Sequence, residues 1–328
     1  MAKALNTALR TAMEANPDVL VMGEDVGKLG GVFRITDGLQ KDFGEHRVLD
    51  TPLAESGIIG TAIGLALHGF RPVCEIQFDG FVFPGYDQIV SQLAKLRFRT
   101  QGRTPMPVVV RIPFGGGIGA VEHHSESPEA LFAHVPGLKV VACSNPADAH
   151  WMLRQAIDSD DPVIFFEPKR RYWEKGQVDL ESAPMPLHAA RVVRPGSTAT
   201  LASYGPTVRT CLDAAAAAES DGIDLEVIDL RTLSPLELGP VFDSVRRTGH
   251  LVVAAEAPGE TSVAAEVVAR VSEECFYSLE APVLRVTGFD TPYPPSKLEE
   301  EYIPDLDRIL DAVDRSLAHG SSDTRERG

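Results

Sequence analysis

The chain has 328 residues, of which 44% are hydrophobic and 24% charged, and a formal net charge of −16 at pH 7. This length exceeds one ordinary hydrophobic core and predicts two globular domains. The negative charge excludes sequence-independent binding to nucleic acid and to anionic membrane surfaces, which would repel the chain. Four scattered cysteines without metal-ligand spacing are typical of a reduced compartment, and no apolar stretch has the length of a signal peptide or a membrane span. We therefore expect a soluble, cytoplasmic protein.

Short apolar runs alternate with helical patterns through the first half of the chain. The runs are rich in β-branched residues and poor in polar ones, which is typical of strands covered on both faces. We expect such strands at 19–26, 71–78, 106–114, 138–144 and 162–168. Helical periodicity appears at 85–102, and a further helix is predicted from Asn145 as the N-cap, with Pro146 at its first position. Strands alternating with helices predict an α/β fold with a mainly parallel sheet.

The alternation stops in a stretch rich in proline and charge and then resumes. We therefore predict four segments, which are a first domain over 1–175, a linker over 176–196, a second domain over 197–318 and a disordered polar tail over 319–328. In the second domain we expect strands at 198–204, 223–231, 250–257 and 282–288, and helices at 206–220, 236–248, 261–275 and 304–318. Both domains are predicted to be mainly parallel α/β sheets flanked by helices.

The stretch DTPLAESGIIGTAIGLALHG, residues 50–69, places one carboxylate, Glu55, before a nearly uncharged helix. The helix dipole favours a carboxylate in the first turn by about 0.3–1 kcal/mol, and this is one sufficient explanation of Glu55. Glycine inside a helix costs about 1 kcal/mol relative to alanine. Gly57, Gly60 and Gly64 therefore indicate that another backbone or a flat ligand approaches closely. A glutamate at such an interface would be desolvated and suited to sharing a proton, which is the second explanation.

Two further stretches carry candidate chemistry. RIPFGGGIGAVEHHSESPEALFAH (111–134) runs from a predicted strand through glycines to His123 and His124, and then into a predicted helix with Glu129 in its first turn. Long loops at the carboxyl ends of parallel strands often carry sites, although a lone loop histidine is often only solvated, and we expect at most one of the pair to be functional. The loop lacks the glycine and lysine signatures of phosphate binding. EIQFDGFVFPGYDQ (75–88) is an aromatic patch that core packing also explains.

Taken together, these stretches resemble the beta subunit of the decarboxylating component of 2-oxo acid dehydrogenase complexes. The motifs MGEDVG, DTPLAESGIIGTAIGLALHG, EIQFDGFVFPGYDQI, HHSESPEALFAHVPGLKVV and DPVIFFEPKRRYW follow one another in the family's order. The resemblance extends to about residue 318, and the second half is similar to the C-terminal domain of transketolase-like enzymes. It implies a thiamine diphosphate pyrimidine-binding domain followed by a transketolase C-terminal-like domain.

The resemblance also implies roles for individual residues. Glu55 matches the glutamate that hydrogen-bonds N1′ of the cofactor's aminopyrimidine and so promotes loss of the proton from the thiazolium carbon. Leu53, Gln77 and Phe81 match positions around the pyrimidine, although branched-chain relatives can carry tyrosine at the Phe81 position. His124, the second histidine of the pair, matches the residue that contacts substrate and assists acyl transfer to lipoyl.

The metal sites of the family divide between its subunits. Magnesium and the diphosphate are held by a Gly-Asp-Gly motif and a downstream asparagine on the alpha subunit, and in this chain TDGLQ, FDGFV and SDGID all lack the leading glycine. We therefore expect half an active site, with thiamine diphosphate shared between the subunits and magnesium bound by alpha. In some relatives, backbone carbonyl groups hold a structural potassium ion. The matching positions in this chain are Val108, Val110, Ala156, Ser159 and Asp161.

The implied assembly is an alpha2-beta2 heterotetramer that passes an acyl group to lipoyl on the acyltransferase core of the complex. EIQFDGFVFPGYDQIV and FFEPKRRYW resemble branched-chain enzymes more than pyruvate enzymes, so branched-chain 2-oxo acids are the expected substrates and pyruvate the alternative. A single-chain transketolase-type enzyme would need a diphosphate-binding domain, for which the sequence before residue 19 leaves no room. A non-catalytic α/β partner-binding protein is an alternative of a different class, and it predicts no requirement for Glu55.

Overall fold

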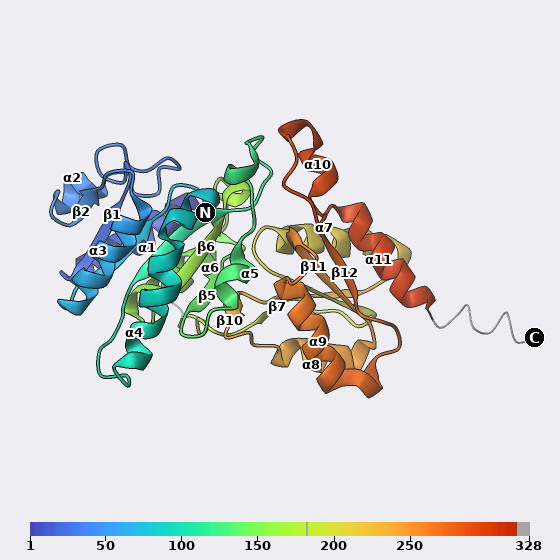
Figure 1. Ribbon diagram of the computed structural model, residues 1–328. Helices are drawn as coiled ribbons and strands as arrows, with labels where there is room; N and C mark the ends of the chain where they lie inside the picture. Colours follow the sequence, from blue (N-terminus) through green and yellow to red (C-terminus); the bar gives the residue numbers. More distant parts are fainter. Residues whose placement is uncertain (182, 320–328) are drawn as a thin grey trace, which may run out of the picture.

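The two halves of the chain form two α/β domains that lie side by side (Figure 1). The computed structural model describes residues 1–181 and 183–319. The predicted fold class is confirmed, because each domain contains a mainly parallel sheet flanked by helices. Of the predicted tail, residues 320–328 lie outside the described part of the chain. No helix within the described residues is long and apolar enough to cross a membrane.

Five strands of the first sheet lie within the predicted apolar runs. The strands of this sheet, in spatial order, are β10 (Thr232–Ser234), β5 (Lys139–Ala142), β6 (Val163–Pro168), β4 (Val109–Phe114), β3 (Arg71–Glu75), β1 (Val19–Gly23) and β2 (Val48–Asp50). The five that were predicted are β1, β3, β4, β5 and β6. All neighbouring pairs are parallel except β10 with β5, which is antiparallel. The carboxyl ends of the parallel strands therefore lie at one edge, where such folds place their sites.

Helices cover both faces of this sheet, and alternate residues of each strand face opposite layers. The helical segments of the first domain are α1 (Ala2–Ala15), α2 (Leu39–Phe43), α3 (Glu55–Leu67), η1 (Asp79–Gly85), η2 (Gln88–Leu93), α4 (Ala94–Arg99), η3 (Glu122–His124), α5 (Glu129–Ala133), α6 (Pro146–Asp158) and η4 (Lys169–Arg171). Val163 and Phe165 pack with α1 and α6 in one buried cluster, whereas Ile164 and Phe166 pack with α3 and α5 in the other. The predicted N-cap of α6 is confirmed, because the Asn145 side chain accepts a hydrogen bond from the Asp148 amide.

The second domain has a five-stranded sheet in the order β12 (Leu284–Gly288), β11 (Leu251–Pro258), β8 (Ala199–Ser203), β9 (Leu225–Asp229) and β7 (Arg191–Arg194). Its helical segments are α7 (Thr207–Ala218), η5 (Glu219–Asp221), α8 (Gly239–Thr248), α9 (Val263–Cys275), η6 (Phe276–Ser278), η7 (Ser296–Leu298), α10 (Glu299–Tyr302) and α11 (Leu306–Ala318). Helices α7 and α11 share one buried cluster, and α8 and α9 contribute to the cluster on the other face.

Three strands were not predicted from the sequence, and the first of them, β2, spans only Val48–Asp50. The segment predicted as a linker over 176–196 ends in β7, which pairs antiparallel with β9 at the edge of the second sheet. Strand β10 lies in the second half of the sequence but extends the sheet of the first domain. Both pairings join residues far apart in the sequence, and neither β7 nor β10 has the continuous apolar run by which the predicted strands were identified.

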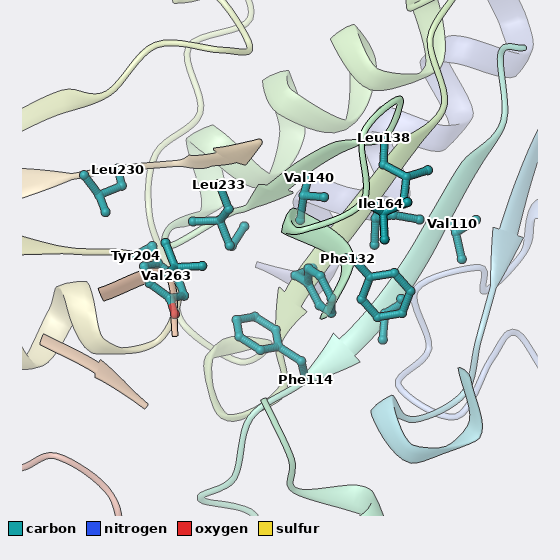
Figure 2. Packing of buried hydrophobic residues seen from close by; sticks show 14 of the residues in the cluster. Val110, Phe114, Phe132, Leu138, Val140, Ile164, Tyr204, Leu230, Leu233 and Val263 are labelled. Carbon is teal, nitrogen blue, oxygen red and sulfur yellow. The ribbon is translucent and has the colours of Figure 1, made fainter. Parts of the chain in front are cut away.

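The two domains share one hydrophobic core. Figure 2 shows Phe114 and Phe132 of the first domain converging with Tyr204, Leu233 and Val263 of the second half of the chain. The rings of Phe114 and Phe132 each make an edge contact with Phe166. Because this core is continuous, loops at the carboxyl edge of the first sheet are held against the second domain.

Candidate active site

The predicted site residues lie at the carboxyl edge of the first sheet. Glu55 begins α3, directly after β2, and Gln77 and Phe81 follow β3. The loop after β4 ends in η3, which carries His124. Segment η1, which contains Phe81, packs against both α3 and η3, so it links the segment of the glutamate to that of the histidine.

Glu55 is buried at the first position of α3, and 6% of its surface is exposed. None of the described residues donates a hydrogen bond to its carboxylate. Glu24, which directly follows β1, lies close by, and burial together with the charges of Glu55 and Asp25 raises the pKa of the Glu24 carboxyl. A buried carboxylate that lacks a donor favours a hydrogen-bond donor brought in from outside.

The other residues predicted for the pyrimidine pocket lie on segments that follow or precede the same edge of the sheet. Gln77 donates a hydrogen bond from Nε2 to Asp25 Oδ2 at 3.2 Å, so its amide is held by the loop after β1. Leu53 precedes α3 and is 76% exposed. An apolar side chain this exposed, next to a buried acid, is a surface that another molecule can cover.

His124 lies between two aromatic rings. Its imidazole stacks on Phe78, with ring centroids 4.1 Å apart, and meets the edge of Phe81 at 5.0 Å. Its Nδ1 atom is buried and makes no hydrogen bond to any described residue. His123, in contrast, is exposed and lies 3.2 Å from Glu122. The two histidines therefore have different surroundings, because His124 lies between Phe78 and Phe81, whereas the His123 ring lies 6.3 Å from that of Phe81.

A buried ion pair that the sequence analysis missed anchors the far side of this loop. Asp79 and Lys169 pair in full burial, and Asp79 Oδ2 also accepts a hydrogen bond of 2.7 Å from the Glu126 amide. Burial raises the pKa of the Asp79 carboxyl to about 6, although Lys169 opposes the shift. Lys169 opens the run KRRYW and Asp79 the run DGFV, but no spacing rule relates residues 90 positions apart.

A second buried charge cluster supports the strands below the site. Arg111 of β4 donates to Glu75 at 2.7 Å and to both oxygens of Glu167 at 2.6 and 2.8 Å. The Tyr172 hydroxyl donates to the same Glu167 carboxylate at 2.8 Å. Each charge has a directed partner, which is the condition under which buried ions are tolerated. The cluster joins three adjacent strands directly beneath the loops that carry the candidate residues.

Both halves of the chain match families of known proteins. Residues 1–174 match the family described as "Transketolase, pyrimidine binding domain", and residues 188–309 match "Transketolase, C-terminal domain". The pyruvate dehydrogenase E1 component subunit beta of Leifsonia xyli is 63% identical over 97% of this chain and 95% of its own length. The 3-methyl-2-oxobutanoate dehydrogenase subunit beta of Mycobacterium tuberculosis is 54% identical over 97% of this chain and 91% of its own length. The chain belongs to the E1 beta subunit family of 2-oxo acid dehydrogenases.

Solved structures agree with this assignment at the level of the fold. A structure titled "Split gene transketolase, inactive beta4 tetramer" superposes with a TM-score of 0.79. The superposition covers 96% of this E1 beta chain and 97% of that chain. At 22% sequence identity this likeness shows the fold alone. The resemblance inferred from the five ordered motifs is thus confirmed as family membership.

The residues of this E1 beta chain fit the pyrimidine end of thiamine diphosphate. Glu55 offers a buried carboxylate without a donor, Phe81 an aromatic ring and Leu53 an apolar surface, which suits a flat heteroaromatic ring with a protonated nitrogen. Within residues 1–181 and 183–319, no three His, Cys, Asp or Glu side chains are grouped so that they could hold a metal ion.

At least three of the five carbonyl groups predicted around a potassium ion accept hydrogen bonds within the chain. The Val108 carbonyl accepts from the Val163 amide at 2.9 Å, and the Ala156 carbonyl accepts from the Ser159 amide at 3.3 Å. The Ser159 carbonyl accepts from the Arg71 guanidinium at 2.6 Å. Potassium binding here stays a prediction, and the guanidinium is a competitor for one of its ligands.

Proposed function

We propose that this chain is the beta half of a thiamine diphosphate-dependent enzyme that decarboxylates branched-chain 2-oxo acids and passes the acyl group to lipoyl on an acyltransferase core. The observation that carries the proposal is the Glu55 carboxylate, buried at the start of α3 without a donor among the described residues. When thiamine diphosphate is bound, it supplies the electron sink that a 2-oxo acid needs to lose carbon dioxide.

The chain's own residues then have distinct tasks. Glu55 accepts a hydrogen bond from a ring nitrogen and holds the proton there, which a carboxylate in a dry pocket does strongly. Phe81 covers a ring face, and Gln77 keeps the neighbouring loop in place through Asp25. His124, fixed between Phe78 and Phe81, presents a ring nitrogen to substrate and to the arriving lipoyl group.

The active enzyme is proposed to form with an alpha subunit in an alpha2-beta2 heterotetramer. The alpha subunit would bring the magnesium ion and the diphosphate site, because this chain lacks the Gly-Asp-Gly motif. Docking to a basic domain of the acyltransferase core through the acidic second half would follow from the net charge of −16. Such docking weakens as salt rises, since salt screens exposed charges.

Pyruvate is the second candidate substrate, and one observation favours it. The Leifsonia relative named for pyruvate is 63% identical to this chain, against 54% for the Mycobacterium relative named for 3-methyl-2-oxobutanoate. A 2-oxoisovalerate dehydrogenase subunit beta of Pseudomonas aeruginosa is 46% identical over 97% of this chain and 94% of its own length. The branched-chain proposal is based on motif resemblance, and the direct comparison is kcat/KM for pyruvate against 3-methyl-2-oxobutanoate in the complex with alpha.

Substitution of Glu55 tests the proposed role. Glu55→Gln, co-purified with alpha, should still bind its partner but lose 2-oxo acid decarboxylation by orders of magnitude. Glu45→Gln, an exposed glutamate of the same domain, is the matched control and should keep full turnover. Near-normal turnover of Glu55→Gln would overturn the proposal and favour a non-catalytic partner-binding protein.

A further inference from the structure

The glycine loop, residues 115–121, connects β4 to η3 and binds carboxylates of the second domain. The amides of Gly117 and Gly119 donate to the two oxygens of Glu299, at 3.0 and 2.9 Å. The Tyr293 hydroxyl donates to the same carboxylate at 2.9 Å. Glu299 begins α10, which stands beside this loop in Figure 1 and lies 180 residues from Gly119.

A second carboxylate of the same domain holds the start of the loop. Glu256 of β11 accepts a hydrogen bond from the Gly116 amide through Oε1, and its Oε2 lies 3.0 Å from the Arg170 guanidinium. Both carboxylates are buried. Backbone amides that converge on an anion form the nest that many proteins use for phosphate, and here the anions are side chains of the chain itself.

The glycines are required by this close approach. A Cβ atom at Gly116 would overlap the Tyr293 hydroxyl, and one at Gly117 would lie 2.8 Å from Arg170 Cδ. Gly117 also has φ +82°, a left-handed conformation that side chains rarely adopt. The glycine run that matched no phosphate signature thus has a structural partner, which is the second domain.

We propose that Glu299, assisted by Glu256, is a positioning residue that orders the glycine loop and thereby sets His124 between Phe78 and Phe81. The loop enters η3 at Glu122, and beyond η3 the Glu126 amide donates to the Asp79 carboxylate, so the position of His124 is determined from both sides. The importance of this placement for turnover rests on the proposed function, whereas the ordering of the loop does not.

Hydrogen exchange measures the ordering directly. In the full chain, Glu299→Ala should raise the exchange rates of the amides in the peptide covering 115–121 by about tenfold or more, because hydrogen bonds to a charged acceptor are lost. Glu299→Gln keeps one acceptor oxygen and should give intermediate rates. Glu300→Ala, at the exposed neighbouring position of α10, is the control and should leave the loop protected. Unchanged exchange in Glu299→Ala would overturn the proposal.

A double-mutant cycle in the complex with alpha tests the link to His124. Glu299→Ala should lower kcat by about ten- to a hundredfold, since misplacement by 1 Å has effects of this size. In a His124→Ala background it should lower kcat no further, and Glu299→Gln should restore part of the turnover. Multiplicative effects of the two substitutions would show that Glu299 does not act through His124.

The role of His124 in turnover and the ordering of the loop by Glu299 are tested separately. If His124→Ala keeps full turnover, the proposed role of His124 is wrong, and the exchange experiment still decides whether Glu299 orders the loop. If Glu299→Ala lowers the melting temperature of the chain by more than Glu300→Ala does, Glu299→Gln becomes the deciding variant. It supports the proposal if the loop alone exchanges faster, and it contradicts the proposal if exchange rises equally in both domains.

Discussion

The imidazole of His124 lies parallel to the ring of Phe78, with the two planes 10° apart and the centroids separated by 4.1 Å. Phe78 in turn lies under the Lys169 ammonium, 5.7 Å from its ring centroid. Lys169 forms an ion pair with Asp79, which is the residue directly after Phe78 in the chain. A buried ion pair, an aromatic ring and the candidate histidine therefore form one stack, and the orientation of His124 depends on all of it.

Replacement of Phe78 should separate orientation from chemistry. Phe78→Leu keeps an apolar side chain but removes the flat surface on which His124 rests, so we expect kcat in the complex with alpha to fall by about tenfold. Phe98→Leu is the matched control, because Phe98 is 85% exposed and does not contact the site. Equal turnover of the two variants would show that stacking does not place His124.

The buried cluster around Arg111 predicts a large loss of stability. Arg111→Met leaves Glu75 and Glu167 buried without their cation, and breaking a buried pair in this way costs about 3–5 kcal/mol. Arg97→Met is the control, since Arg97 pairs with Asp161 at 2.6 Å but both side chains are about one-third exposed. That pair should contribute at most about 1 kcal/mol. Urea unfolding of both variants makes the comparison, and a similar loss in the two would contradict the argument.

The pH dependence of the Arg111 variant has a definite sign. Burial raises the pKa of the Glu75 carboxyl even with Arg111 present, and removal of the cation raises it further. A carboxyl whose folded pKa lies above its unfolded pKa stabilises the fold at low pH, and this stability is lost as pH rises. The deficit of Arg111→Met should therefore be smaller at pH 5 than at pH 8. A constant deficit would mean that neither carboxyl takes up a proton.

Glu129 makes the same linkage measurable in the unmodified chain. Its carboxyl is fully buried, accepts a 2.6 Å hydrogen bond from the Tyr204 hydroxyl, and has its pKa raised to about 7 by burial. The folded chain therefore holds a proton here that the unfolded chain releases near pH 4.5, and stability falls as pH rises from about 4.5 to 7.

Glu129→Gln removes the titrating carboxyl and should make the free energy of unfolding depend less on pH. The expected result is a free energy of unfolding at pH 8 that is higher than that of the unmodified chain by up to about 3 kcal/mol, with the two converging near pH 5. Burial also raises the pKa of the Asp229 carboxyl to about 7, so part of the dependence of stability on pH should remain in both the variant and the unmodified chain. Chemical unfolding at pH 5, 6, 7 and 8 gives the profile, and parallel profiles would assign the slope to other groups.

Much of the fold could be predicted because its signals are local. Strands such as β4 and β6 are buried on both faces and read as continuous apolar runs. The start of α6 is encoded by Asn145 and Pro146 side by side. Strand β7 was missed because RVVR is a short, partly exposed edge strand whose partner lies more than 30 residues away.

The site divides in the same way. Glu55, Phe81 and His124 could be named because each lies in a short motif whose residue order was enough for the resemblance. Glu299 could not, because its role consists of contacts with amides 180 residues earlier and depends on how the two domains pack. A glycine run predicts an unusual backbone conformation, but it does not say which group the backbone approaches.

The glycines of α3 leave one face of that helix without side chains. The sequence suggested that another backbone or a ligand approaches them, but a Cβ atom at Gly60 or Gly64 would meet nothing of this chain within 4 Å. Gly60→Ala should therefore stabilise the isolated chain by up to about 1 kcal/mol through helix propensity. If this face packs against alpha, the same substitution should weaken assembly with that subunit, because the added methyl group lies where the partner approaches. Ser272→Ala, in helix α9 of the second domain, is the control. It raises helix propensity at a position outside the glycine-rich face of α3. Titration of each variant with alpha measures the affinity, and unchanged affinity of Gly60→Ala would show that Gly60 does not lie in the interface with alpha.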